Sequence, residues 1–272
     1  MRRHAFLDSP GPVAIAHRGG ADNAPENTVP AFAAAVDLGY RHLETDVHLT
    51  RDGVVVAFHD PRLYRVTDST GAIEDLDIAT VEAADAGYAF STDGGQSFPF
   101  RGQGVRVPRL EGLLERWPQA CINIDPKSDA VVDPLVAVLD RHAAWDRVCV
   151  GSFSDARIKR IRSTAGDKAC TSMGPRAVAI ARIASVAGVM PRQGADCAQV
   201  PPRQGRIPIV TPRFVRAAHR SGLAVHVWTI NDEATMHDLL AMGVDGVMTD
   251  RPGLLREVFA ARDLALDGAR SV

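Results

Sequence analysis

Cysteine is scarce in this chain, with four residues among 272. No two of them stand in CxxC spacing, and each lies within a short apolar run. Such residues pack as small hydrophobic side chains, so we expect all four to be buried and expect neither a disulfide framework nor a zinc site. The four are Cys121, Cys149, Cys170 and Cys197.

An excess of one charge is also lacking, because 31 Lys and Arg residues stand against 33 Asp and Glu residues and the formal net charge is −2. A broad electropositive field is therefore not expected, which argues against nucleic acid and an anionic bilayer as partners. An anionic ligand must be captured locally, and we expect a small-molecule substrate.

Long hydrophobic runs are missing as well. The longest nearly apolar stretch, 177–190, is interrupted by Arg182 and Ser185 and is shorter than the roughly 20 residues of a membrane span. It predicts a buried helix. The N-terminal residues MRRHAFLDSPG contain two arginines with no apolar run after them, which is not typical of a secretory signal, so we expect a cytoplasmic protein.

The composition is otherwise that of a globular protein, with 46% hydrophobic and 24% charged residues. Short apolar runs of strand length alternate with segments whose apolar residues recur at helical spacing. The expected strands are 13–16, 42–49, 121–124, 148–151, 169–171, 197–200, 223–228 and 246–249. The expected helices are 29–38, 110–117, 131–139, 156–161, 177–186, 212–218, 233–240 and 254–260.

Strands that alternate with helices and run in one direction form a parallel sheet, and eight such units close a (β/α)₈ TIM barrel. We predict this α/β architecture for 1–272 as a single domain, since single α/β barrels commonly have roughly 250 residues. An open doubly wound sheet produces a similar pattern and is the alternative.

Two segments interrupt the alternation. Asp52-Gly53 lies between apolar runs in 49–58, which predicts a hairpin at the end of the second strand. The segment 60–107 is too long for a structureless loop in a compact domain, so we expect a small inserted subdomain there. Its aromatic residues either fill its own core or line a substrate groove: Tyr64, Tyr88, Phe90, Phe98 and Phe100.

Polar residues that close apolar strands are the first candidates for chemistry, because a barrel's active site forms at the carboxyl ends of its strands. The first strand ends in His17-Arg18-Gly19. Histidine suits proton transfer near neutral pH, arginine binds phosphate or carboxylate, and glycine lets the backbone approach a ligand. The run 54–58 similarly ends in His59-Asp60, although a single histidine is more often structural.

Two further strand ends carry carboxylates. Glu44 and Asp46 share one face of the second strand, because side chains alternate along a strand. Asn123, Asp125 and Lys127 share a face at the end of the third. Buried carboxylates on one face repel unless a cation joins them, so these strand ends predict a divalent metal site, whereas the alternative is an exposed acidic edge.

At this point the sequence resembles the glycerophosphodiester phosphodiesterase family. The matching motifs follow one another in the family's order along nearly the whole chain. They are HRG (17–19), PENT (25–28), LETDVHLTRDG (43–53), VVAFHD (55–60), VPRLEGLLE (107–115), IDPK (124–127), VWTIND (227–232) and GVDGVMTDRP (243–252). The resemblance implies a (β/α)₈ barrel with a small insertion after the second strand, where 60–107 falls.

The resemblance also implies a role for each site residue. His17 and His59 match the two histidines that act as general base and general acid. Arg18 and Lys127 match the cations that bind the phosphate, and Trp228 matches an aromatic residue near the glycerol or headgroup. The implied reaction hydrolyses a glycerophosphodiester to sn-glycerol 3-phosphate and an alcohol. Water or the glycerol 2-hydroxyl is the nucleophile, and a pair of histidines of opposite protonation predicts a bell-shaped pH profile.

Glu44, Asp46 and Asp125 match the three carboxylates that hold a divalent metal, Ca²⁺ or Mg²⁺, with Mn²⁺ as a further candidate. The family commonly has glutamate where this chain has Asp125, so this ligand is shorter by one methylene. The difference bears on the position or identity of the metal.

Three polar residues are expected to be structural. Glu26 and Asn27 are expected to organise the loop before a helix capped at Thr28, and Asp250 is expected to cap the last helix, outside the site. Three alternatives remain for the function. They are a lysophospholipase D that uses the same residues, a metal-dependent sugar isomerase or aldolase barrel, and a non-catalytic phosphate-binding barrel.

Overall fold

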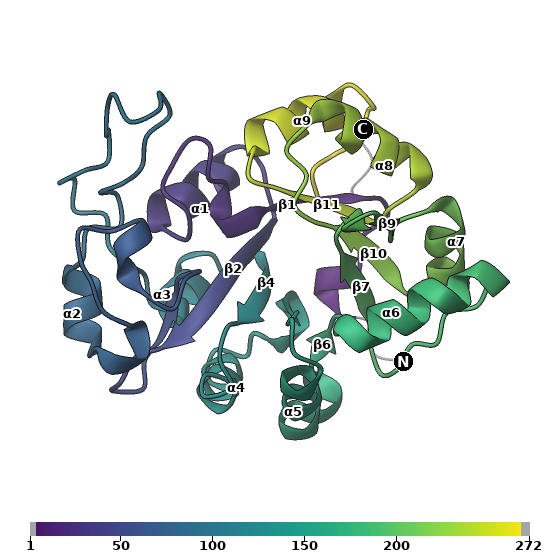
Figure 1. The fold of residues 1–272 in the computed structure, drawn as a ribbon, viewed down its shortest axis with the longest axis horizontal. Coiled ribbons are helices and arrows are strands. Elements are labelled where there is room, and N and C mark those ends of the chain that lie inside the picture. Colours follow the sequence, from purple (N-terminus) through teal and green to yellow (C-terminus); the bar gives the residue numbers. More distant parts are fainter. Residues whose placement is uncertain (1–3, 268–272) are drawn as a thin grey trace.

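The computed structural model describes residues 4–267, so the first three residues of the N-terminal segment discussed above lie outside it. Eight parallel strands form the barrel wall (Figure 1). They are β1 (Val13–Ala16), β2 (His42–Leu49), β4 (Cys121–Pro126), β5 (Val148–Val150), β6 (Cys170–Thr171), β7 (Cys197–Val200), β10 (Ala224–Val227) and β11 (Gly246–Thr249).

The strands pair in the order β6-β5-β4-β2-β1-β11-β10-β7. A parallel bridge between Ser172 and Cys197 joins the two ends of this order, so the sheet closes on itself. The predicted (β/α)₈ barrel is confirmed, and the open doubly wound sheet is excluded.

Helices surround the strands (Figure 1). They are α1 (Val29–Asp37), α3 (Leu110–Arg116), α4 (Val132–Arg141), α5 (Asp155–Ala165), α6 (Pro175–Ala184), α7 (Pro212–Arg220), α8 (Glu233–Met242) and α9 (Pro252–Ala260). Side-chain oxygens cap several of them at the N-terminus, as at Thr28, Ser154, Thr211 and Asp232. The main core lies between the strands and these helices. No helix within residues 4–267 has both the length and the apolar character needed to cross a membrane.

The expected hairpin is present, since β3 (Val55–Ala57) pairs antiparallel with β2. The chain after it contains the short helix α2 (Ile78–Ala83) and packs on a second core. That core is mainly aliphatic, with Leu63, Ile73 and Val81 at its centre. None of the five aromatic residues of 60–107 lines the cavity described below, so the groove interpretation does not hold for them.

The prediction of a buried helix over 177–190 is wrong for one of its faces. Ala177 and Ala181 are buried, but Ile180, Ile183 and Val186 are 47%, 75% and 60% exposed. A run that is apolar all round indicates a buried helix from its composition alone. Here the small alanines fill the inward face of α6, and the larger aliphatic side chains lie on the outer face.

Two histidines of the barrel wall are buried and titrate below their usual range. Burial lowers the pKa of both His42 and His226 from 6.5 to about 4. Between these values the unfolded chain binds the protons and the folded chain does not, so the free energy of unfolding falls as the pH falls. His42 Nε2 lies 3.1 Å from the Phe6 carbonyl oxygen, a hydrogen bond that a glutamine amide can also donate.

Lowering the pH from about 6.5 to about 4.5 decreases the free energy of unfolding of the wild type. We expect this decrease to be about 2 kcal/mol smaller in His42→Gln. Chemical denaturation at both pH values measures this difference. His237→Gln, which changes a partly exposed histidine of α8, is the control. Equal losses in His42→Gln and the wild type would contradict the lowered pKa of His42.

Candidate active site

One cavity of about 640 Å³ lies at the carboxyl ends of the barrel strands. In a (β/α)₈ barrel this end carries the active site. All the residues predicted to act at a site line this cavity. They are His17, Arg18, Glu44, Asp46, His59, Asp125, Lys127 and Trp228.

The register between β2 and β4 groups the carboxylates. Glu44 stands opposite Asn123, and Asp46 stands opposite Asp125. Because alternate residues of a strand share a face, these four side chains point into the cavity together. All four are buried, which excludes the exposed acidic edge considered from the sequence.

Two cations approach the buried carboxylates. Lys127 Nζ lies 2.6 Å from Asp46 Oδ1 and 2.8 Å from Asp125 Oδ2. Arg18 Nε lies 3.1 Å from Asp46 Oδ2, as an ion pair without the angle of a hydrogen bond. Burial favours the neutral form of Asp46, but the charges of Lys127 and Arg18 outweigh it and lower the pKa of that carboxyl. Asp46 is therefore held as an anion.

The two other carboxylates of this group, Glu44 and Asp125, are less fully neutralised by cations than Asp46. Burial, and then the charge of Asp46, raise the pKa of Glu44 to about 7. Burial also raises the pKa of Asp125, although Lys127 opposes it. Asp125 Oδ1 is buried and has no hydrogen-bond partner among the described residues. A hard divalent cation prefers such carboxylate oxygens, so the donor set fits Ca²⁺, Mg²⁺ or Mn²⁺.

His17 begins a tight turn after β1 and is paired with a carboxylate on each side of its ring. Nδ1 lies 2.6 Å from Asp250 Oδ1, and Nε2 lies 3.8 Å from Glu44 Oε2. Burial lowers the pKa of His17, but Glu44 and Asp250 outweigh it and the net shift is upward. The prediction that Asp250 only caps the last helix is wrong, because Arg251 occupies the N-cap of α9 and no side chain caps it.

Glycine is required in the turn that carries His17. Gly19 has φ of 81°, and a Cβ atom there would lie 2.8 Å from the Phe32 backbone nitrogen. Arg18 has φ of 54°, and its backbone N–H donates to Glu44 Oε2 at 3.0 Å. The turn therefore packs directly on α1 and presents its backbone to a site carboxylate.

His59 is held in a similar way. Its Nδ1 lies 2.6 Å from Asp60 Oδ1. Asp60 in turn pairs with Arg65, and this interaction outweighs burial and lowers the pKa of Asp60. An ionised aspartate at Nδ1 leaves Nε2 of His59 as the ring nitrogen available to a ligand.

Glu26 and Asn27 do organise the first loop, and both also contact site residues. Glu26 Oε1 accepts from Arg18 at 2.9 Å and from Arg65 at 2.6 Å. Asn27 donates to Asp46 Oδ2 at 3.0 Å and accepts from Thr45 at 2.8 Å. The loop thus connects Arg65, which pairs with the aspartate beside His59, to Arg18 and to the carboxylate of Asp46.

The cavity extends beyond the charged centre along an apolar wall. Trp228 packs against Phe153, with ring centroids 5.4 Å apart, and Phe153 is 67% exposed. Met173, Val178 and Ile209 continue this wall. Trp228 was expected here, whereas nothing in the sequence marks Phe153, Met173, Val178 or Ile209, because each lies singly in an ordinary loop or helix and carries no polar group.

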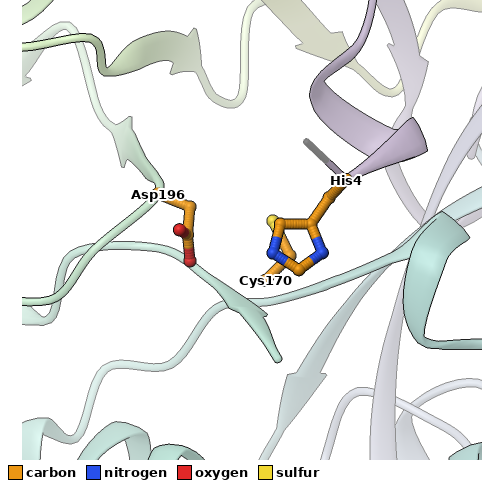
Figure 2. Close-up of side chains that lie close together, drawn as sticks. All are labelled: His4, Cys170 and Asp196. Carbon is orange, nitrogen blue, oxygen red and sulfur yellow. The ribbon is translucent and has the colours of Figure 1, made fainter. Parts of the chain in front are cut away.

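A second group of metal-ligand types lies away from this cavity. Figure 2 shows His4, Cys170 and Asp196, whose donor atoms are within 4.8 Å of one another. Asp196 accepts from the Thr171 N–H at 2.9 Å, so one of its oxygens already bonds to the backbone of β6. Cys170 packs with the other three cysteines and Phe6 in an apolar cluster of buried, free thiols. The cysteines are therefore small hydrophobic residues, as predicted.

Comparisons with known proteins agree with this arrangement. The model of the glycerophosphoryl diester phosphodiesterase family matches residues 17–254. A probable glycerophosphodiester phosphodiesterase 2 of Mycobacterium tuberculosis is 39% identical over 94% of this chain and 94% of its own. A glycerophosphodiester phosphodiesterase of Caldanaerobacter subterraneus is 28% identical over 89% of this chain and 96% of its own.

The solved structure of a putative glycerophosphoryl diester phosphodiesterase from Silicibacter pomeroyi superimposes with a TM-score of 0.79 at 25% identity. The alignment covers 96% of this chain and 99% of that one. With a family match over most of its length and a relative at 39% identity, this chain belongs to the glycerophosphoryl diester phosphodiesterase family.

Proposed function

We propose that this enzyme hydrolyses glycerophosphodiesters to sn-glycerol 3-phosphate and an alcohol, with His17 and His59 as the acid-base pair. One observation carries the proposal. Two histidines, each bonded through Nδ1 to an aspartate, border one group of buried carboxylates and cations at the barrel mouth. His17 adjoins Glu44, and the charge of His59 acts on Asp46.

In this proposal Glu44, Asp46 and Asp125 hold a divalent cation, Ca²⁺ or Mg²⁺, with Mn²⁺ as the third candidate. The unpartnered Asp125 oxygen and the raised pKa of Glu44 support the assignment. When bound, such an ion neutralises charge on the phosphoryl oxygens. Asp125 is shorter by one methylene than the glutamate common in the family, which bears on the position or identity of the ion.

Arg18 and Lys127 bind the non-bridging phosphate oxygens and offset the charge that builds on phosphorus. Asp250 accepts the Nδ1 proton of His17, so that Nε2 is free to take the proton of the attacking hydroxyl. The raised pKa of His17 makes it a stronger base. His59 donates its Nε2 proton to the departing alcohol as the bond from phosphorus to that oxygen breaks. Water or the glycerol 2-hydroxyl supplies the attacking oxygen.

The apolar wall of Phe153, Met173 and Val178 favours a second substrate class, lysophospholipids. A wall of this kind is able to pack against an acyl chain. The same histidines and carboxylates would then perform a lysophospholipase D reaction. The two substrate classes differ in the acyl chain, which only the lysophospholipid would pack against the apolar wall.

The first test is turnover of glycerophosphocholine by protein stripped with EDTA and resupplied with Ca²⁺, Mg²⁺ or Mn²⁺, with a lysophosphatidylcholine assay in parallel. We expect EDTA to abolish release of glycerol 3-phosphate and one of the cations to restore it. Full activity in EDTA would contradict the metal assignment. Turnover of the lysolipid alone would replace the small diester by a lipid substrate, and silence on both would favour the non-catalytic phosphate-binding barrel.

A further inference from the structure

We propose that α6 and the start of α7 form a docking surface for an anionic lipid bilayer. The surface begins with exposed aliphatic side chains. Ile180, Ile183, Val186 and Val189 are 47%, 75%, 60% and 59% exposed. Soluble proteins expose scattered apolar residues, whereas neighbouring ones on a single face mark an interaction site.

These residues form one stripe. Ile180, Ile183 and Val186 recur every third residue along α6 and the 3₁₀ turn Ser185–Ala187 that follows it, and Val189 lies just beyond that turn. Residues three apart are neighbours on a helix surface, so their side chains project from the same side. In Figure 1, α6 lies on the outside of the barrel, near α7. Ala177 and Ala181 attach the opposite side of α6 to the core.

A basic cavity of about 370 Å³ adjoins the stripe at Val186. Its lining includes three guanidinium groups and two hydroxyl groups. The lining residues are Arg182, Ser185, Val186, Thr211, Pro212, Arg213 and Arg216.

This cavity suits a phosphate group. Arg182 Nε donates to the Pro208 carbonyl oxygen at 2.7 Å, which holds the side chain over the cavity wall. Thr211 caps α7 by accepting from the Phe214 N–H, so the positive end of that helix also faces this region. Planar guanidinium groups bind phosphate oxygens in pairs. The phosphodiester of a lipid headgroup is a ligand of this kind.

The surrounding segment carries a strong local charge that the net charge of the chain conceals. Residues 175–220 contain eight arginines and one acidic residue, Asp196, although the whole chain has a formal net charge of −2. Arg182, Arg203 and Arg220 donate to backbone carbonyl oxygens, which leaves their charge in place. The expectation of no broad electropositive field rests on the net charge of the whole chain, which does not report the excess of arginine in this segment.

Charge selects a bilayer over a second copy of this chain. A symmetric dimer through α6 would bring two arginine-rich faces together, which is unfavourable. An anionic bilayer attracts basic residues, and the aliphatic stripe enters the boundary between headgroups and acyl chains. Pro175 and Val178 of the same helix line the catalytic cavity, so docking brings the cavity mouth toward lipid-derived substrates. The binding itself does not depend on the proposed reaction.

The test is co-sedimentation with vesicles of phosphatidylcholine alone and of phosphatidylcholine with phosphatidylglycerol. We expect binding to the anionic vesicles, weakened by salt, and little binding to the neutral ones. The variant Arg213→Gln/Arg216→Gln should bind about 30-fold more weakly, because each basic residue near an anionic surface contributes roughly fivefold. Ile183→Ser/Val186→Ser should also lose binding through its apolar contacts.

Matched controls lie on the inserted segment. Arg62→Gln/Arg106→Gln makes the same change in net charge, and Tyr64→Ser removes another exposed apolar side chain. Both should bind as the wild type, and all variants should keep the wild-type circular dichroism spectrum and melting temperature. Equal binding of the wild type to both vesicles, or undiminished binding of the two docking variants, would overturn the proposal. A concentration-dependent dimer that Ile183→Ser/Val186→Ser abolishes would assign the face to a second copy and overturn it as well.

Discussion

Replacement of His17 or His59 by alanine is expected to lower kcat on glycerophosphocholine by about 10²-fold or more, because each removes one proton transfer from the transition state. His17→Ala removes a base whose ring Asp250 orients at 2.6 Å. His59→Ala removes an acid whose ring Asp60 orients at 2.6 Å. The kcat of the double variant should be little lower than that of the less active single variant, since the two groups act in one step. Steady-state kinetics with saturating metal measure these effects.

His237→Ala, on the outer helix α8, is the matched control and should retain wild-type kcat. Asp250→Asn tests the role of His17 through the pH profile as well as through the loss of kcat. It should lower kcat and displace the pH profile, because His17 then loses the carboxylate that raises its pKa. A change below threefold in both single histidine variants would remove them from the catalytic roles.

The second large effect is expected at Asp46. Asn27, Arg18 and Lys127 all converge on this carboxylate, which makes it the centre of the charged group. Asp46→Asn keeps the shape of the side chain and removes its charge. A metal ion contributes several kcal/mol of transition-state stabilisation, so we expect a loss of about 10³-fold in kcat/KM together with weaker binding of Mn²⁺.

Titration of Mn²⁺ by electron paramagnetic resonance separates the two effects in Asp46→Asn. Asp133→Asn, which alters an exposed ion pair with Arg160, is the control for the loss of one negative charge. Wild-type affinity for Mn²⁺ in Asp46→Asn would assign the cation elsewhere. Lost affinity with unchanged turnover would remove the metal from the reaction.

Local sequence pattern predicted the barrel because strand and helix periodicities are set by residues near one another in the chain. Glu44 and Asp46 are two residues apart on a strand, and this spacing alone predicts that their side chains share one face. The order of eight strand and helix units then implied that strand ends would meet. The structure brings His17, Asp46 and Asp125 to one cavity accordingly.

Contacts across long sequence distances were beyond the sequence pattern. Asp250 lies 233 residues from His17, and its place before Arg251-Pro252 resembles an ordinary helix start. The exposure of the outer face of α6 is beyond the sequence pattern for a related reason. Composition reports how apolar a helix is, but only packing determines that Ala181 faces the core and Ile183 faces outward.

The most direct test of the account is ³¹P nuclear magnetic resonance of glycerophosphocholine turnover in ¹⁸O-enriched water with the metal-loaded enzyme. We expect the diester signal to be replaced by that of glycerol 3-phosphate, with choline released. We also expect ¹⁸O to enter the phosphate, whether water attacks directly or opens a cyclic intermediate. The same sample with His59→Ala should convert at most about one hundredth as fast. Release of phosphocholine instead, or an unlabelled phosphate with choline carrying the ¹⁸O, would contradict cleavage between phosphorus and the alcohol oxygen at this site.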